Sequence, residues 1–245
     1  MGRLTGERRA LAAAVLAFYG FLYLIVGMTA PSEWTAAFAG MALVYGIGFF
    51  SVVAGYFWAR WYSIGVGMSG LITAVFSIVQ IGMEPVLVFY GATHAFVSLA
   101  LWGNGMSLAF DGRKEWRERF HLDENATHKL GKSVIRLGIS LPYVILYALA
   151  PRDGAGEALL AALAGAVAVS GLFGMLRLRG WGVVALAGGT LLVGLSLIGQ
   201  PCESAVAAFG NGYAINVGAA GFAAVVAMTA ALAPLARPVA RYLRG

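Results

Sequence analysis

The sequence is poor in charge. Only 11% of its 245 residues are Asp, Glu, Lys or Arg, whereas 60% are hydrophobic. In soluble domains about a quarter of all residues are charged, so this chain has too few charged residues to cover a surface that faces water. Side chains that face lipid need no polar group. The composition therefore excludes an ordinary soluble domain and predicts an integral membrane protein.

Cysteine and histidine are scarce as well. Cys202 is the only cysteine, which excludes an intrachain disulfide and a multi-cysteine metal site. A haem held by two histidines inside the membrane needs a partner for His94, but His121 and His128 fall in a charged linker. All three lysines lie in that linker too, which argues against retinal-type chemistry. We expect no metal ion and no cofactor.

Long apolar runs dominate the remainder of the chain. Each is long enough, or nearly so, to cross about 30 Å of hydrocarbon with about 20 residues. No strand-like alternation runs through them, so they must be helices. The sequence thus predicts an all-α, polytopic transmembrane bundle with eight spans. These lie near residues 10–29, 36–59, 62–82, 86–110, 133–150, 156–176, 181–199 and 213–235.

The basic residues predict the orientation. With eight spans and a cytoplasmic N-terminus, the cytoplasmic segments are 1–9, 60–61, 111–132, 177–180 and 236–245. Arg152 is then the only one of the 17 lysines and arginines on the external side, as the positive-inside rule requires. We expect a protein of the cytoplasmic (inner) membrane with both termini in the cytoplasm.

The chain divides into two similar halves. We expect membrane halves at 1–110 and 133–245, joined by the charged cytoplasmic linker 111–132. The segment "AFAGMALVYG" at 37–46 resembles "ALAGAVAVSG" at 162–171. Four spans in each half would give a parallel 4+4 repeat. The alternative is a chance match between helices rich in glycine, alanine, valine and leucine.

Small residues recur every fourth position on two of the spans. Such stripes let the backbones of membrane helices approach closely, so we expect them to form packing faces. The first half is instead rich in aromatic residues, which could face lipid, a partner or a hydrophobic ligand. The stripes are Ala158, Ala162, Ala166, Ser170 and Gly174 on one span, and Ala219, Ala223, Ala227 and Ala231 on the other.

His94 is the one titratable residue placed deep in the membrane, where a polar group costs free energy to bury. It is a candidate ligand-binding residue, together with Tyr90, Thr93 and Asn104. The alternative is a neutral histidine that bonds to a helix carbonyl or to a neighbouring hydroxyl group.

Polar residues near the external ends of the spans could form a vestibule, and the candidates are Glu84, Glu203 and Asn216. Glu84 precedes Pro85 at a helix start, so it equally suits the dipole of the helix N-terminus.

The function that these features favour is the handling of a small neutral or apolar solute or lipid by a carrier or channel-like protein. The alternative is an accessory or structural subunit of a larger membrane complex. No nucleophile motif and no nucleotide-binding motif occurs, so a membrane-embedded enzyme that uses His94 is the least favoured reading. We expect lipid and other membrane proteins or further copies of the chain as partners, through small-residue or aromatic helix faces, and no nucleic acid.

Overall fold

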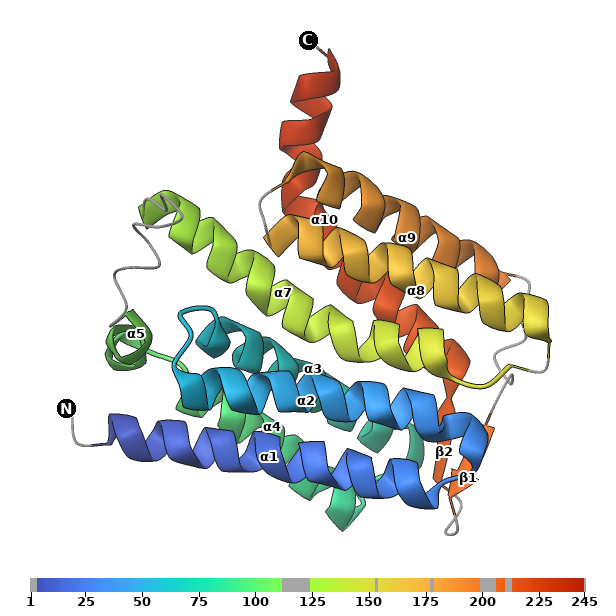
Figure 1. Cartoon of the computed structure of the whole chain (residues 1–245), viewed down its shortest axis with the longest axis horizontal. Coiled ribbons are helices and arrows are strands. Elements are labelled where there is room, and N and C mark those ends of the chain that lie inside the picture. The colour runs from blue at the N-terminus through green and yellow to red at the C-terminus, as the bar shows by residue number, and fades with distance from the viewer. Residues whose placement is uncertain are drawn as a thin grey trace. The chain divides into compact units, whose positions relative to one another are not determined.

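The fold was analysed in a computed structural model, which describes residues 4–111, 124–152, 154–176, 179–198, 206–209 and 213–244. Helices account for nearly all of these residues (Figure 1). They are α1 (Thr5–Thr29), the 3₁₀ turn η1 (Ser32–Trp34), α2 (Thr35–Ala54), α3 (Ala59–Ile81), α4 (Pro85–Ala100), α5 (Asn104–Asp111), α7 (Glu124–Leu149), α8 (Ala155–Leu176), α9 (Gly180–Ile198) and α10 (Val217–Arg244). The predicted all-helical class is confirmed.

Seven helices in the described part of the chain are long and apolar enough to cross a membrane. The length and composition of these helices suggest a membrane-embedded protein. The sequence predicts eight spans, and the difference lies in the fourth. α4 has 16 residues, which at about 1.5 Å per residue falls short of a hydrocarbon core of about 30 Å.

The fourth predicted span, 86–110, is wrong as a single helix. α4 ends at Ala100, and the short helix α5 begins at Asn104. Gly103 between them has a φ of +108°, a conformation that no helix can continue through. The second predicted span, 36–59, ends too late for a similar reason, because Gly55 with a φ of +73° follows the last residue of α2, Ala54.

Two short strands precede α10. β1 (Val206–Phe209) pairs antiparallel with β2 (Tyr213–Asn216), in the register Val206 with Asn216. The last helical span is predicted from residue 213, but α10 begins four residues later, at Val217. Within the described residues, this is the one stretch where the backbone N–H and C=O groups pair between strands and not within a helix.

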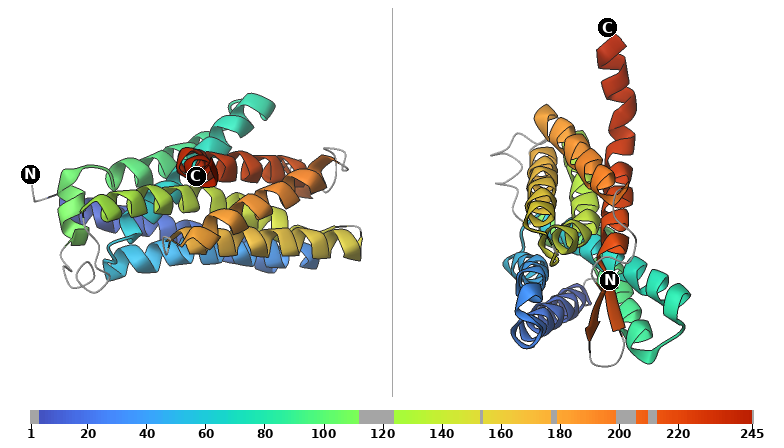
Figure 2. Two further views of the ribbon diagram at one scale, coloured as in Figure 1. Left: turned by 90° about the horizontal axis from the view of Figure 1, so that it is seen from above. Right: turned by 90° about the vertical axis from the view of Figure 1, so that its right-hand side faces the viewer.

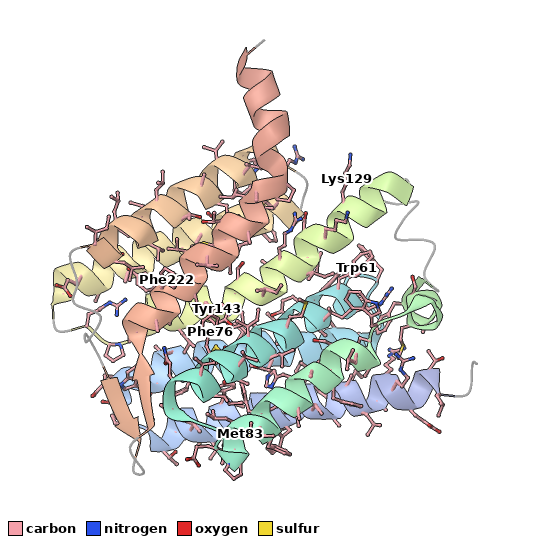
Figure 3. All side chains as sticks on the ribbon, turned by 180° about the vertical axis from the view of Figure 1, so that it is seen from behind. Trp61, Phe76, Met83, Lys129, Tyr143 and Phe222 are labelled. Atoms are coloured by element: carbon pink, nitrogen blue, oxygen red, sulfur yellow. The ribbon has the colours of Figure 1, made fainter. Side chains whose placement is uncertain are left out.

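The chain forms two compact units. The first comprises Met1–Tyr23 and Ala42–Ile139, and the second comprises Leu24–Met41 and Ser140–Gly245. In the first unit, α3 packs along α4, and Met83 lies at the turn that joins them (Figure 3). The proposed boundaries at 110 and 133 and the 4+4 repeat stay predictions.

Within the second unit, α8 lies beside α9, and α9 packs against α10 (Figure 2). Glycines bring α8 and α9 together. A Cβ atom on Gly189 would lie 2.8 Å from the backbone nitrogen of Ala168, and one on Gly174 would lie 2.6 Å from Cα of Gly182. The two backbones therefore touch, as small residues in membrane helices allow.

The small-residue stripe expected on α8 coincides with its packed face at Gly174, which is buried against Gly182 of α9, but not along its whole length. Ala162, Ala166 and Ser170 are exposed. The buried face is one residue further round, at Ala161, Ala164, Ala168, Leu172 and Met175. On α10 the stripe is also packed only in part, because Ala231 is buried whereas Ala219 is exposed and Ala223 and Ala227 are half-buried. A spacing of four alone cannot say which side of a helix faces its neighbours.

Candidate functional site

The described residues of the first unit enclose His94 almost completely, leaving 1% of it exposed. α4 carries the histidine, and α3 makes room for it at a glycine. A Cβ atom on Gly70 would overlap the imidazole ring. One on Gly67 would lie 2.8 Å from the His94 carbonyl oxygen. Glycine at these positions is thus what lets α4 and its histidine approach the backbone of α3.

Both ring nitrogens of His94 have partners. Nδ1 lies 2.7 Å from the carbonyl oxygen of Tyr90, one turn earlier on α4. A carbonyl oxygen only accepts, so Nδ1 donates this hydrogen bond. Nε2 lies 2.7 Å from the hydroxyl oxygen of Tyr45 on α2 and accepts a hydrogen bond from it. This pattern belongs to the neutral imidazole with its proton on Nδ1.

Aromatic rings surround the imidazole on its other sides. The ring centroid of Tyr90 lies 4.1 Å from that of His94, and the centroid of Tyr19 lies 4.4 Å away. Tyr45 meets the imidazole edge-on at 5.7 Å. Tyr23 of α1 stacks on Tyr45 at 5.3 Å and forms side-chain hydrogen bonds with Tyr90 and Tyr45. A second pair of hydroxyl groups, Tyr19 and Thr93, lies 2.7 Å apart. We call Tyr19, Tyr23, Tyr45, Tyr90, Thr93 and His94 the tyrosine–histidine cluster.

One edge of the cluster reaches the surface of the unit. Tyr19, Tyr45 and His94 are buried, whereas Tyr23, Tyr90 and Thr93 are half-buried. Beside that edge, Phe18 of α1 and Phe89 of α4 are exposed, and their ring centroids lie 6.5 Å apart. The cluster therefore joins an inner polar group, His94 with Tyr45, to an apolar surface between α1 and α4.

The cluster contains no charged side chain. Between Ala10 and Ala59 the only charged residue is Glu33, and α4 has none. No group of three or more metal-ligating side chains occurs among the described residues. Chemically, the arrangement can donate and accept hydrogen bonds from neutral groups, and it has no counter-charge for an ion.

The predicted site residues separate into two groups. His94, Tyr90 and Thr93 lie together in the cluster. Asn104 lies beyond the Gly103 break at the start of α5, so it does not continue the face of α4 that carries His94. The structure describes no contacts of its side chain.

The three predicted vestibule residues are not brought together by anything described. Glu84 is exposed and precedes α4, without a side-chain hydrogen bond to the helix end. Glu203 lies outside the described residues. Asn216 ends β2, with only its backbone pairing described.

Sequence reasoning missed Tyr19, Tyr23 and Tyr45 as partners of the histidine. The sequence did contain a signal for them. Each tyrosine places a hydroxyl group in an apolar run, and a buried hydroxyl group needs a hydrogen-bond partner, which a phenylalanine would not need. Their convergence on His94 depends on how α1, α2 and α4 pack, which the sequence does not reveal.

No protein-family model matches this chain, and no curated protein and no solved structure shows a detectable similarity to it. The class of the molecule therefore rests on its own helices, which suggest a membrane-embedded, all-helical protein.

Proposed function

We propose that this chain is a multi-pass membrane protein that binds a small neutral, largely apolar molecule at the tyrosine–histidine cluster. The observation that carries the proposal is the neutral hydrogen-bonding group of His94 and Tyr45, connected to exposed apolar rings at the cluster edge. An apolar ligand body suits the rings of Phe18 and Phe89, and a hydroxyl or carbonyl group suits the half-buried Tyr90 and Thr93. An ion would lack a counter-charge there.

The proposal includes eight crossings of a cytoplasmic membrane, with both termini inside. The fourth crossing then consists of α4 with the residues that flank it, 82–84 and 101–103. One feature of the first unit supports this alternation. The start of α1, the end of α2, the start of α3 and the end of α4 meet through arginine hydrogen bonds to helix carbonyls. Successive helices that alternate in direction are expected of short-looped membrane bundles.

A photoactivatable probe tests the binding site. We expect a diazirine-bearing monoacylglycerol, added to the purified protein in detergent, to label peptides from residues 13–28 and 85–100. Tyr45→Phe and His94→Gln should each reduce this labelling about five- to tenfold, because one hydrogen bond to a buried polar group is lost or misdirected. Mass spectrometry of the digested protein measures the labelled fraction.

Tyr62→Phe is the matched control. Its buried hydroxyl group donates to the carbonyl oxygen of Val44 at 3.0 Å and lies outside the cluster, so labelling should stay as in the wild type. Labelling spread evenly over α1, α4 and α8, with no response to the cluster variants, would rule out the proposed site.

An accessory subunit of a larger membrane complex is the second candidate function. The exposed side of α8 favours it, because Ala162, Ala166 and Ser170 there would admit the close approach of another helix. Absence of cluster labelling, together with stoichiometric co-purification of another membrane protein, would favour this function over the first.

A further inference from the structure

The last turn of α4 is held by two arginines from other helices. Arg8 of α1 donates from Nη2 to the carbonyl oxygens of Leu99 and Trp102, at 3.1 and 2.8 Å. Arg60 of α3 donates from Nε to the carbonyl oxygen of Leu101 at 2.9 Å. The last carbonyl groups of a helix lack partners within the helix. The Arg8 and Arg60 side chains donate hydrogen bonds to these carbonyl groups, and the bonds fix the positions of both arginines.

A third arginine lies at the same end of the first unit. Arg9 donates to the carbonyl oxygens of Val52 and Val53 at the end of α2, at 2.9 and 2.8 Å. Its guanidinium group also lies over the ring of Phe110, 5.1 Å from the centroid. Arg9 thus donates from both Nε and Nη2 and lies over an aromatic ring, whereas Arg8 donates from Nη2 alone.

Among the side chains that the structure describes at this end, positive charge exceeds negative charge. A helix C-terminus carries about half a negative charge, so the ends of α2 and α4 offset about one of the three guanidinium charges. Glu7 is the acidic residue nearest to them in the described part of α1, and its side chain is exposed. Nε and Nη1 of Arg8 have no acceptor among the described residues, although a guanidinium group has five donors.

The start of α7 adds to this charge. A Cβ atom on Gly131 would lie 2.7 Å from Cε2 of Trp61, so the early part of α7 packs beside the start of α3. Lys129 and Lys132 flank that contact and are exposed. Figure 3 shows Lys129 pointing away from the helices.

Amphipathic aromatic rings border the same end. Tyr56 and Trp58, in the turn between α2 and α3, stack with their centroids 5.8 Å apart. Trp102 is 59% exposed. Such rings favour the level of the lipid headgroups, where one edge is wet and the other is apolar.

We propose that Arg8 and Arg60 hold the phosphate group of an anionic phospholipid at this end of the first unit. Nε and Nη1 of Arg8 remain to donate to phosphate oxygens, and Trp102 supports the glycerol and upper acyl region. The aromatic border identifies the source of the phosphate as a lipid, since a phosphate ion in solution would gain nothing from it. This site is separate from the tyrosine–histidine cluster and does not depend on the function proposed for it.

Lipid binding to the purified chain tests the site. Native mass spectrometry with added phosphatidylglycerol or phosphatidylcholine should show preferential retention of phosphatidylglycerol. Arg8→Gln should weaken that retention about fivefold, because one interfacial arginine is lost, and Arg8→Lys should lie between the wild type and Arg8→Gln. Arg152→Gln, in the second unit, is the control and should bind as the wild type does.

Three outcomes would overturn the proposal: equal retention of the two lipids by the wild-type protein, unchanged retention by Arg8→Gln, or competition by inorganic phosphate as effective as by phosphatidylglycerol. Arg8→Gln also removes two hydrogen bonds to α4, so its melting temperature is measured in parallel. Arg8→Lys, which keeps the positive charge, covers the case in which Arg8→Gln does not fold. With that variant, retention of phosphatidylglycerol equal to that of the wild type would contradict the role of the guanidinium group.

Discussion

Gly70→Ala should lower the free energy of unfolding by about 2–3 kcal/mol, at the upper end of the cost of inserting a methyl group into a packed core. The new Cβ atom would overlap the His94 ring, which is enclosed on its other sides by Tyr19, Tyr45 and Tyr90. The ring cannot swing aside without losing its hydrogen bonds to Tyr90 and Tyr45. Titration of the protein in mixed micelles with SDS, followed by tryptophan fluorescence, measures the change.

Two further variants isolate the cause. Gly46→Ala on α2 places a methyl group where nothing lies within 4 Å. We expect it to be neutral or to stabilise by up to about 1 kcal/mol, because alanine favours a helix over glycine. In the double variant Gly70→Ala with His94→Ala, the overlap disappears, so the cost should be well below the sum of the single costs. Additive costs would show that the two residues do not meet.

Gly138→Ala should destabilise the first unit at least as strongly, by about 3 kcal/mol. Its new Cβ atom would lie 2.5 Å from the carbonyl oxygen of Tyr62 and 2.9 Å from Cα of Gly65. Both obstacles are backbone atoms of α3, so no side-chain rotation can relieve them and α7 must move away from α3. The same SDS titration measures the loss.

Gly188→Ala on α9 is the control for this prediction, since nothing lies within 4 Å of its added Cβ atom. A wild-type unfolding midpoint for Gly138→Ala would mean that α3 and α7 do not pack through Gly65 and Gly138.

Composition and run length allowed the fold class to be predicted because a membrane helix must satisfy its backbone within itself. Most helix ends lie within a few residues of the predicted ones. Two of the exceptions have local causes. Gly103 looks like one more glycine in an apolar run, and only its positive φ reveals that α4 ends before it. The hairpin at residues 206–216 contains apolar residues that a hydropathy pattern cannot distinguish from a helix start.

The candidate site was only half visible in the sequence. His94 was singled out because a polar ring in an apolar run costs free energy unless it is paired. Its partners come from α1 and α2, at sequence distances of 75 and 49 residues for Tyr19 and Tyr45, and such pairings follow from helix packing alone. The packed face of α8 was predicted only in part for a related reason. Alanine suits both a helix interface and a lipid-facing surface, so its spacing does not identify the packed side.

Eight crossings require that the short helix α4 crosses the membrane, which labelling of single cysteines tests most directly. Cys202→Ser removes the only native thiol group. Met83→Cys and Gly105→Cys then place one thiol group at either end of the short α4, at positions that are exposed. Glu33→Cys, in the turn between α1 and α2, serves as the external reference.

In sealed vesicles of known orientation, an impermeant maleimide should label residues 33 and 83 from the external side only. It should label residue 105 from the cytoplasmic side only. This result would establish that the chain crosses the membrane between residues 83 and 105, as eight spans require. Labelling of residues 83 and 105 from the same side would contradict it, and would leave seven crossings with the two termini on opposite sides of the membrane.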